Sequence, residues 1–185
     1  MTERSVRGAI RARRSWPRVT DAAPSDAELA ELLSAAAGVA DHAALSPWRV
    51  IALRGDARRR LGAALVEASG AEGTAAERMA AKPLRAPLLL ALVAAPRPHP
   101  KVPEWEQDAC AAGVGHMLQL LLDDAGWGVM WRTGPHTRHP AIARMHGLAE
   151  HERLLGWLYV GGRLEADRPD RRSADRAANR LSVLD

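Results

Sequence analysis

The stretch EWEQDACAAGVGHMLQLLLDDAGWGVMWRTG, residues 104–134, contains the two patterns from which the fold class can be inferred. Pro103 suits the first turn of a long helix, and Gly126 stands where glycine commonly ends one. The next residues, WGVMWRTG (127–134), indicate a strand followed by a turn. We therefore expect a long helix that leads directly into a strand.

The segments before residue 103 predict shorter helices and two strands. Thr2 can cap a first helix with apolar residues on one face, and capping boxes at 25–28 and 74–77 predict two more helix starts. A further helix is expected from Asp56 to near Gly70. The strands are WRVIAL (48–53) and APLLLALVA (86–94), and the second is apolar throughout, as is typical of a strand covered on both faces.

The last predicted elements are a short helix from Pro140 and a strand, RLLGWLYVGG (153–162). Helices and strands in this order indicate an α+β sandwich, with helices packed around an antiparallel or mixed sheet. A length of 185 residues favours a single domain over 1–185. Residues 163–185 are mostly polar but include LSVL (181–184), so we expect this tail to pack on a partner subunit.

Composition restricts the possible function classes. The 26 basic residues exceed the 22 acidic ones by four, but they recur along the whole chain, whereas a nucleic-acid-binding protein concentrates them on one face. Cys110 is the only cysteine, which excludes an internal disulfide, and its apolar surroundings predict that it is buried. No apolar run reaches the roughly 20 residues of a membrane span. We therefore expect a cytoplasmic protein that does not bind membranes.

Several motifs are missing from the sequence. It has no phosphate-binding loop ending in Gly-Lys-Ser/Thr, no Gly-x-Ser-x-Gly and no His-Glu-x-x-His. The Gly-x-Gly pairs at 113–115 and 126–128 lack the third glycine of a dinucleotide-binding fold. His136 and His139 lie in a proline-flanked turn far from Cys110, so we expect no metal site.

Four segments contain residues suited to a flat, phosphorylated aromatic ligand: RRS (13–15), DHAALSPWR (41–49), MWRTG (130–134) and GWLYVGG (156–162). Arg13 and Arg14 can form charge-assisted hydrogen bonds to a phosphate, and Ser15 adds a hydroxyl group. Arg132 is another cation, placed between Trp131 and Thr133. Structural roles are the alternative: a solvated helix end for Arg13 and Arg14, an exposed strand end for Arg132, and the core for Trp48 and Trp157.

Together these segments resemble the FMN-dependent nitroreductases, and the chain is similar to their short, single-domain members from about residue 10 to residue 162. The resemblance rests on RRSWPRV (13–19), PWR (47–49), the stretch 101–134 and GWLYVGG (156–162). It implies a central, mostly antiparallel sheet flanked by helices. It also implies an obligate homodimer with one FMN at each of two subunit interfaces, and a C-terminal tail exchanged between the subunits.

The resemblance implies roles for individual residues. The FMN phosphate and ribityl chain would be held by Arg13, Arg14 and Ser15. The flavin ring and phosphate end would be lined by Trp131, Arg132 and Thr133. His42 would approach the flavin from the neighbouring subunit. The sequence departs from the family pattern at three positions, Ala40, Ser46 and Pro17. The predicted contacts to the FMN phosphate are therefore better supported than those to the flavin ring.

The implied activity is transfer of a hydride from NAD(P)H through FMN to a small oxidised acceptor, such as a nitroaromatic compound or a quinone. A cation near the N1–O2 edge of the flavin would stabilise the reduced ring, and Arg13 and Arg132 are both candidates. We assign no catalytic acid or base, because solvent can protonate the product.

Two alternatives stay open at this point. A non-catalytic basic module would bind nucleic acid through Arg11, Arg13, Arg14 and the arginine-rich tail, with an affinity that falls steeply with salt. An FMN enzyme with a different acceptor, for example one that carries out reductive dehalogenation, would share the cofactor site.

Overall fold

A four-stranded sheet forms the centre of the protein, whose computed structural model describes residues 5–164 and 180–184. The strand order is β1-β2-β4-β3, and each neighbouring pair is antiparallel. The predicted α+β fold with an antiparallel sheet is therefore confirmed. The strands are β1 (Trp48–Leu53), β2 (Leu88–Ala94), β3 (Trp127–Arg132) and β4 (Arg153–Gly162).

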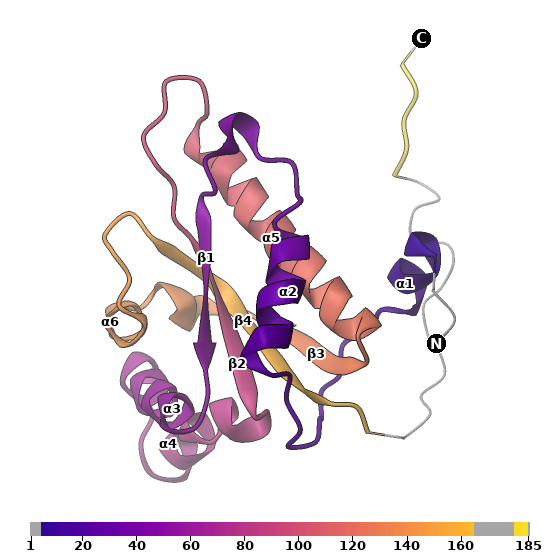
Figure 1. Ribbon diagram of the computed structural model, residues 1–185. Coiled ribbons are helices and arrows are strands. Elements are labelled where there is room, and N and C mark those ends of the chain that lie inside the picture. Colours follow the sequence, from indigo (N-terminus) through magenta and orange to yellow (C-terminus); the bar gives the residue numbers. More distant parts are fainter. Residues whose placement is uncertain (1–4, 165–179, 185) are drawn as a thin grey trace.

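Helices cover both faces of the sheet (Figure 1). On one face lie α2 (Asp26–Ala36) and α5 (Glu104–Asp124), and on the other lie α3 (Asp56–Ser69), α4 (Gly73–Ala80) and α6 (Pro140–His146). The alternate side chains of β2 reach both cores: Leu88, Leu90 and Leu92 pack toward α5, while Leu89, Ala91 and Val93 pack toward α3. Every residue of β2 is buried, which explains its continuously apolar sequence.

The long helix and the strand after it form as expected. Pro103 occupies the N-cap position of α5, and the chain turns at Gly126 and enters β3 at Trp127. Cys110, in the middle of α5, is buried, and this burial raises the pKa of its thiol. The predicted starts of α3 at Asp56 and α6 at Pro140 are confirmed as well.

The first helix differs from the expectation. α1 (Val6–Ala12) is capped by Ser5, while Thr2 lies outside the described residues. Ala9 is buried, but the other apolar residues expected to share its face are exposed, namely Val6 and Ile10. Among the described residues, the apolar face predicted for this helix is therefore buried at Ala9 and largely exposed at Val6.

The capping box predicted at 74–77 is wrong. The N-cap residue of α4 is Glu72, which has an extended backbone and makes no side-chain capping bond. Gly73 adopts a φ of +51°, a conformation favoured for glycine, and brings the chain into the helix before Thr74. Thr74 is therefore a residue of the helix itself.

Residues 16–22 run beside the end of the sheet formed by β3 and β4. The Trp16 N–H donates to the Val129 carbonyl at 3.0 Å, and the Thr20 N–H donates to the Gly162 carbonyl at 2.8 Å. Gly161 permits this approach, because a Cβ there would lie 2.6 Å from the carbonyl oxygen of Thr20. The segment RRS (13–15) is thereby placed beside β3.

Most of the tail predicted to cross to a partner lies outside the described residues, which end at Leu164 and resume at Arg180. Leu181, Val183 and Leu184 are strongly exposed in the single chain, at 85, 78 and 96%. Tail exchange, the homodimer and the division into one domain over 1–185 stay predictions. None of the helices within the described ranges is both long and apolar enough to cross a membrane.

Candidate functional site

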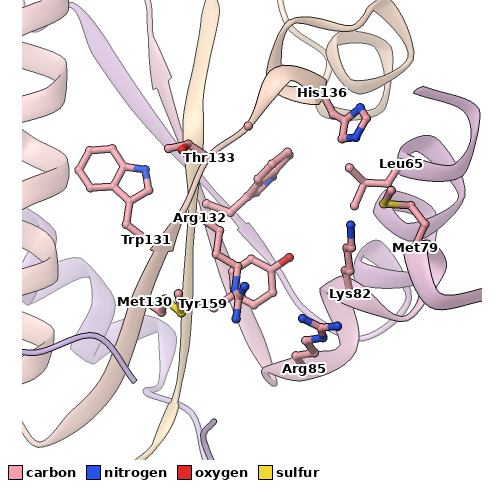
Figure 2. A pocket seen from close by; sticks show the side chains of 12 residues that line it. Leu65, Met79, Lys82, Arg85, Met130, Trp131, Arg132, Thr133, His136 and Tyr159 are labelled. Carbon is pink, nitrogen blue, oxygen red and sulfur yellow. The ribbon is translucent and has the colours of Figure 1, made fainter. Parts of the chain in front are cut away.

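A cavity of about 270 Å³ lies on the α3 side of the sheet, at the end of β3. Its wall combines side chains from helices, strands and the two 3₁₀ helices η2 (Lys82–Arg85) and η3 (Pro135–Arg138). Figure 2 shows how these side chains are arranged around the space. The lining residues are Leu65, Met79, Lys82, Arg85, Met130, Trp131, Arg132, Thr133, Gly134, His136, Trp157 and Tyr159.

Neighbouring side chains of β3 point to opposite sides of the sheet, as the strand geometry requires. Figure 2 shows Trp131 on one side of β3, and Arg132 on the other with Lys82 and Arg85. Trp131 packs against the core on the α5 side, with its ring centroid 4.9 Å from that of His116. Of the two adjacent residues, Arg132 therefore contributes its charge to the cavity, while the Trp131 ring supports the sheet from behind.

The cavity is positively charged. Lys82, Arg85 and Arg132 line it, and among the described residues that form its wall none is acidic. The guanidinium carbon of Arg132 lies 5.1 Å from the centroid of the Tyr159 ring. The Nε of Arg132 is buried and has no hydrogen-bond partner among the described residues. Because a buried charged donor without a partner is unfavourable, this site is suited to a negatively charged ligand.

Tyr159 forms part of the same wall and keeps its proton at neutral pH. Burial raises the pKa of its hydroxyl group, and the nearby charges of Arg132 and Arg85 oppose this effect only in part. A protonated phenol can donate a hydrogen bond into the cavity. The tyrosine therefore adds a neutral donor to the three cations.

The end of β3 lies unusually close to β4. Gly156 has a φ of +140°, and a Cβ there would lie 2.6 Å from both the Arg132 carbonyl oxygen and the Trp131 Nε1. Close by, the pairing of β2 with β4 shifts its register between Leu92 and Val93. Glycine at position 156 thus allows the backbone of β3 to run close to β4. This close approach lies where the end of β3 forms the rim of the cavity.

The predicted phosphate-binding residues lie outside this cavity. Arg13 is the C-cap residue of α1, and Ser15 follows shortly after it. The guanidinium carbon of Arg14 lies 4.1 Å from the centroid of the Trp16 ring. Trp16 is itself held by a hydrogen bond from its Nε1 to the buried carboxylate of Asp123, at 3.2 Å. The single chain therefore brings Arg13, Arg14 and Ser15 to β3 but not into the lining of the cavity.

His42 also lies away from the cavity, in a strained loop. Its Nδ1 is 2.9 Å from a carboxylate oxygen of Glu106, at the start of α5. Three non-glycine residues of the loop have left-handed φ values of 63°, 51° and 47°: Ala43, Ala44 and Ser46. The carboxylate of Asp41 accepts the backbone N–H groups of Leu45 and Ser46 and so holds the loop. Such strain is concentrated at functional sites, which favours a role for this loop.

The structure thus brings together only some of the predicted site residues. Trp131, Arg132 and Thr133 all border the cavity, whereas Arg13, Arg14, Ser15 and His42 do not. Sequence reasoning missed Lys82 and Arg85, although KPLR (82–85) stands directly before a buried strand. The segment GWLYVGG (156–162) was expected to contribute to the site, but no role was predicted for Tyr159, although alternation along the strand places Trp157 and Tyr159 on one face.

Comparison with known proteins gives consistent results. The family model named Nitroreductase matches residues 10–162. A protein of Escherichia coli K12, which carries the provisional name NAD(P)H nitroreductase YdjA, is 32% identical over 152 residues, which are 80% of this chain and 83% of the relative.

Solved structures share the fold at lower sequence identity. A nitroreductase-like family protein from Bacillus cereus has a TM-score of 0.86 at 22% identity, covering 100% of this chain and 98% of the other. A nitroreductase with bound FMN from Bacteroides fragilis has a TM-score of 0.71 at 17% identity, covering 99 and 100%. Iodotyrosine deiodinase bound to FMN and 3-iodo-L-tyrosine has a TM-score of 0.64 at 17% identity, covering 86 and 90%.

Proposed function

Because the chain belongs to the nitroreductase family and is therefore an enzyme, we propose that it is an FMN-dependent oxidoreductase. It would transfer a hydride from NAD(P)H to a small oxidised acceptor, such as a nitroaromatic compound or a quinone. The family match, the name of the E. coli relative and the FMN in two structural neighbours support this proposal.

The observation that carries the proposal for this chain is the unpaired Nε of Arg132. It lies in a cavity with two further cations and a neutral phenol donor, beside the indole of Trp157. FMN carries a phosphate group, and its ring becomes negatively charged when it is reduced. Aromatic side chains together with cationic donors suit both the aromatic ring and the negative charge of such a cofactor.

Residues of two subunits would hold FMN. In this proposal Arg13, Arg14 and Ser15 bind the phosphate and ribityl chain, and Thr133 with the backbone of Trp131 borders the ring. His42 belongs to the loop that would approach from the partner subunit. A homodimer in the cytoplasm is part of the proposal, and it would bring these separate segments together.

Bound FMN would supply the two-electron chemistry, and the side chains would supply binding and electrostatics. Arg132, Lys82 and Arg85 would stabilise negative charge on a ligand in the cavity. Tyr159 would donate a hydrogen bond without losing its proton. Within the part of the chain that the structure describes, no lining residue is a carboxylic acid, and solvent would provide the proton that the product needs.

The test is an absorption spectrum of the freshly purified protein, with the released chromophore identified by mass. We expect flavin bands, FMN near one per chain, and bleaching by NAD(P)H in the absence of air. The variant Arg132→Met should bind FMN at least about tenfold more weakly, a loss of roughly 1.4 kcal/mol. The control Arg59→Met removes an exposed arginine of α3 and should bind as the wild type does.

A colourless protein that also fails to take up added FMN would overturn the proposal. The alternative of another acceptor has support from the deiodinase neighbour, which shares the fold. It can be tested by comparing the oxidation of the reduced enzyme by nitroaromatic, quinone and halogenated phenol acceptors. The alternative of a non-catalytic, nucleic-acid-binding module is not supported, since the chain belongs to an enzyme family.

A further inference from the structure

The wall of the cavity contains an indole that is held from behind by a buried histidine. Trp157 in β4 is 5% exposed and lines the cavity, and its Nε1–H donates to the Nε2 of His146 at 3.1 Å. His146 is the last residue of α6 and is 7% exposed. The two ring centroids are 5.9 Å apart, at an interplanar angle of 41°.

The hydrogen bonds of His146 determine which of its nitrogens carries the proton. Its Nδ1 lies 2.8 Å from the carbonyl oxygen of Ile142, which can only accept a hydrogen bond. Nδ1 therefore carries the proton, and the lone pair of Nε2 is left to accept the indole N–H. Burial lowers the pKa of His146, which keeps the ring in this neutral form.

We propose that His146 is a positioning residue of the cavity: its neutral ring accepts the indole N–H of Trp157 and fixes the orientation in which this indole faces the bound ligand. The register of the sheet makes this orientation important, because Trp157 is paired with Arg132 across β3 and β4. A rotated indole would alter the wall directly beside Arg132, whose Nε has no hydrogen-bond partner among the described residues. The identity of that ligand as FMN rests on the proposed function, whereas the indole contact itself does not.

The first measurement reports on the indole without any ligand. The full-length protein, labelled with ¹⁵N-tryptophan, is compared as wild type, His146→Leu, His146→Gln and Trp157→Phe, the last of which assigns the Trp157 indole resonance. In His146→Leu we expect that resonance to move upfield and exchange faster with water. In His146→Gln a side-chain carbonyl can still accept the N–H, so the resonance should stay near its wild-type position.

The second measurement is the dissociation constant for FMN. His146→Leu should raise it roughly five- to tenfold, as expected for the loss of one buried hydrogen bond, and His146→Gln should restore most of the affinity. Combined with Trp157→Phe, the leucine substitution should have no further effect on FMN binding. The control His151→Leu, at an exposed loop residue, should leave both measurements unchanged.

The outcomes separate this inference from the proposed function. An unchanged Trp157 resonance in His146→Leu would overturn the inference, even if that variant bound FMN weakly. An equal loss of FMN affinity in His146→Gln and His146→Leu, with the indole bond kept in the former, would also overturn it. If the wild type bound no FMN, the proposed function would fail, and the indole resonances alone would decide whether His146 positions Trp157.

Discussion

Gly156 of β4 faces the backbone of Arg132 in β3 so closely that a Cβ at position 156 would lie 2.6 Å from the Arg132 carbonyl oxygen. Gly156→Ala would also have to keep a φ of +140°, which side chains rarely allow. We expect this variant to lower the free energy of unfolding by about 1–3 kcal/mol and to weaken FMN binding. Urea unfolding and a flavin titration measure the two effects.

Gly113→Ala is the matched control for this prediction. Gly113 lies in the interior of α5, and a Cβ there would make ordinary contact with Val39 at 3.5 Å. Alanine is favoured over glycine inside a helix, so stability should stay unchanged or rise by up to about 1 kcal/mol. Equal destabilisation by the two substitutions would show that strain at Gly156 is not the cause.

The ion pair between Arg49 and Glu152 should contribute to stability. Both Glu152 oxygens accept from Arg49 at 2.6 Å, and one of them also accepts the Ala149 N–H at 2.9 Å. Glu152→Gln should lower the free energy of unfolding by about 1.5–3 kcal/mol, because its side chain is only 9% exposed. Glu67→Gln, in an exposed pair with Arg144, should cost at most about 1 kcal/mol.

The sign of the pH dependence provides a further check on Glu152. The hydrogen bond from Arg49 lowers the pKa of Glu152 below its ordinary value of 4.5. Its stabilising contribution is therefore complete above pH 4.5 and is lost as the pH falls through the folded-state pKa. The difference between wild type and Glu152→Gln in urea unfolding should shrink over that acidic range. A difference that stayed constant would contradict this assignment.

His146 should make the protein less stable in mild acid. Burial lowers the pKa of His146 below its ordinary value of 6.5, the charge of Arg49 adds to this, and the bond to Ile142 opposes it. The unfolded chain then binds a proton that the folded protein does not bind. Stability is complete above pH 6.5 and falls toward the folded-state pKa, with a slope of up to about 1.4 kcal/mol per pH unit. His146→Gln should show a smaller slope in urea unfolding between pH 7.5 and 5.

Substitutions in the tail test the expected homodimer. If Leu181 and Leu184 pack on a partner, replacing both by aspartate should raise the dimer dissociation constant at least about tenfold, since two charges would be buried. Ser182→Asp introduces a charge between them at a polar position and should have a smaller effect. Sedimentation over a range of concentrations measures this constant. A double variant that sedimented as the wild type does would rule out the proposed tail contact.

Much of the fold could be predicted because its signals are local. Proline and glycine mark the ends of α5 and the start of α6, and the bounds of β1 and β4 match their apolar runs. The failure at Thr74 has a local cause too, because Gly73 could enter the helix first. The candidate site was harder to predict, because a strand places the side chains of adjacent residues such as Trp131 and Arg132 on opposite faces. Which of these two side chains faces Lys82 and Arg85 depends on how distant segments pack.

The sequence by itself determined the kinds of elements, their order and the family, since periodicity, capping residues and motif spacing act over a few residues. Only the tertiary structure decided which charged and polar side chains lie together in the cavity. Arg132, Lys82 and Tyr159 are 27 to 77 positions apart along the chain. They share one cavity because β4 lies between β2 and β3 and because η2 leads into β2. The physical reason is that strand order and side-chain alternation are set by the burial of both faces of the sheet.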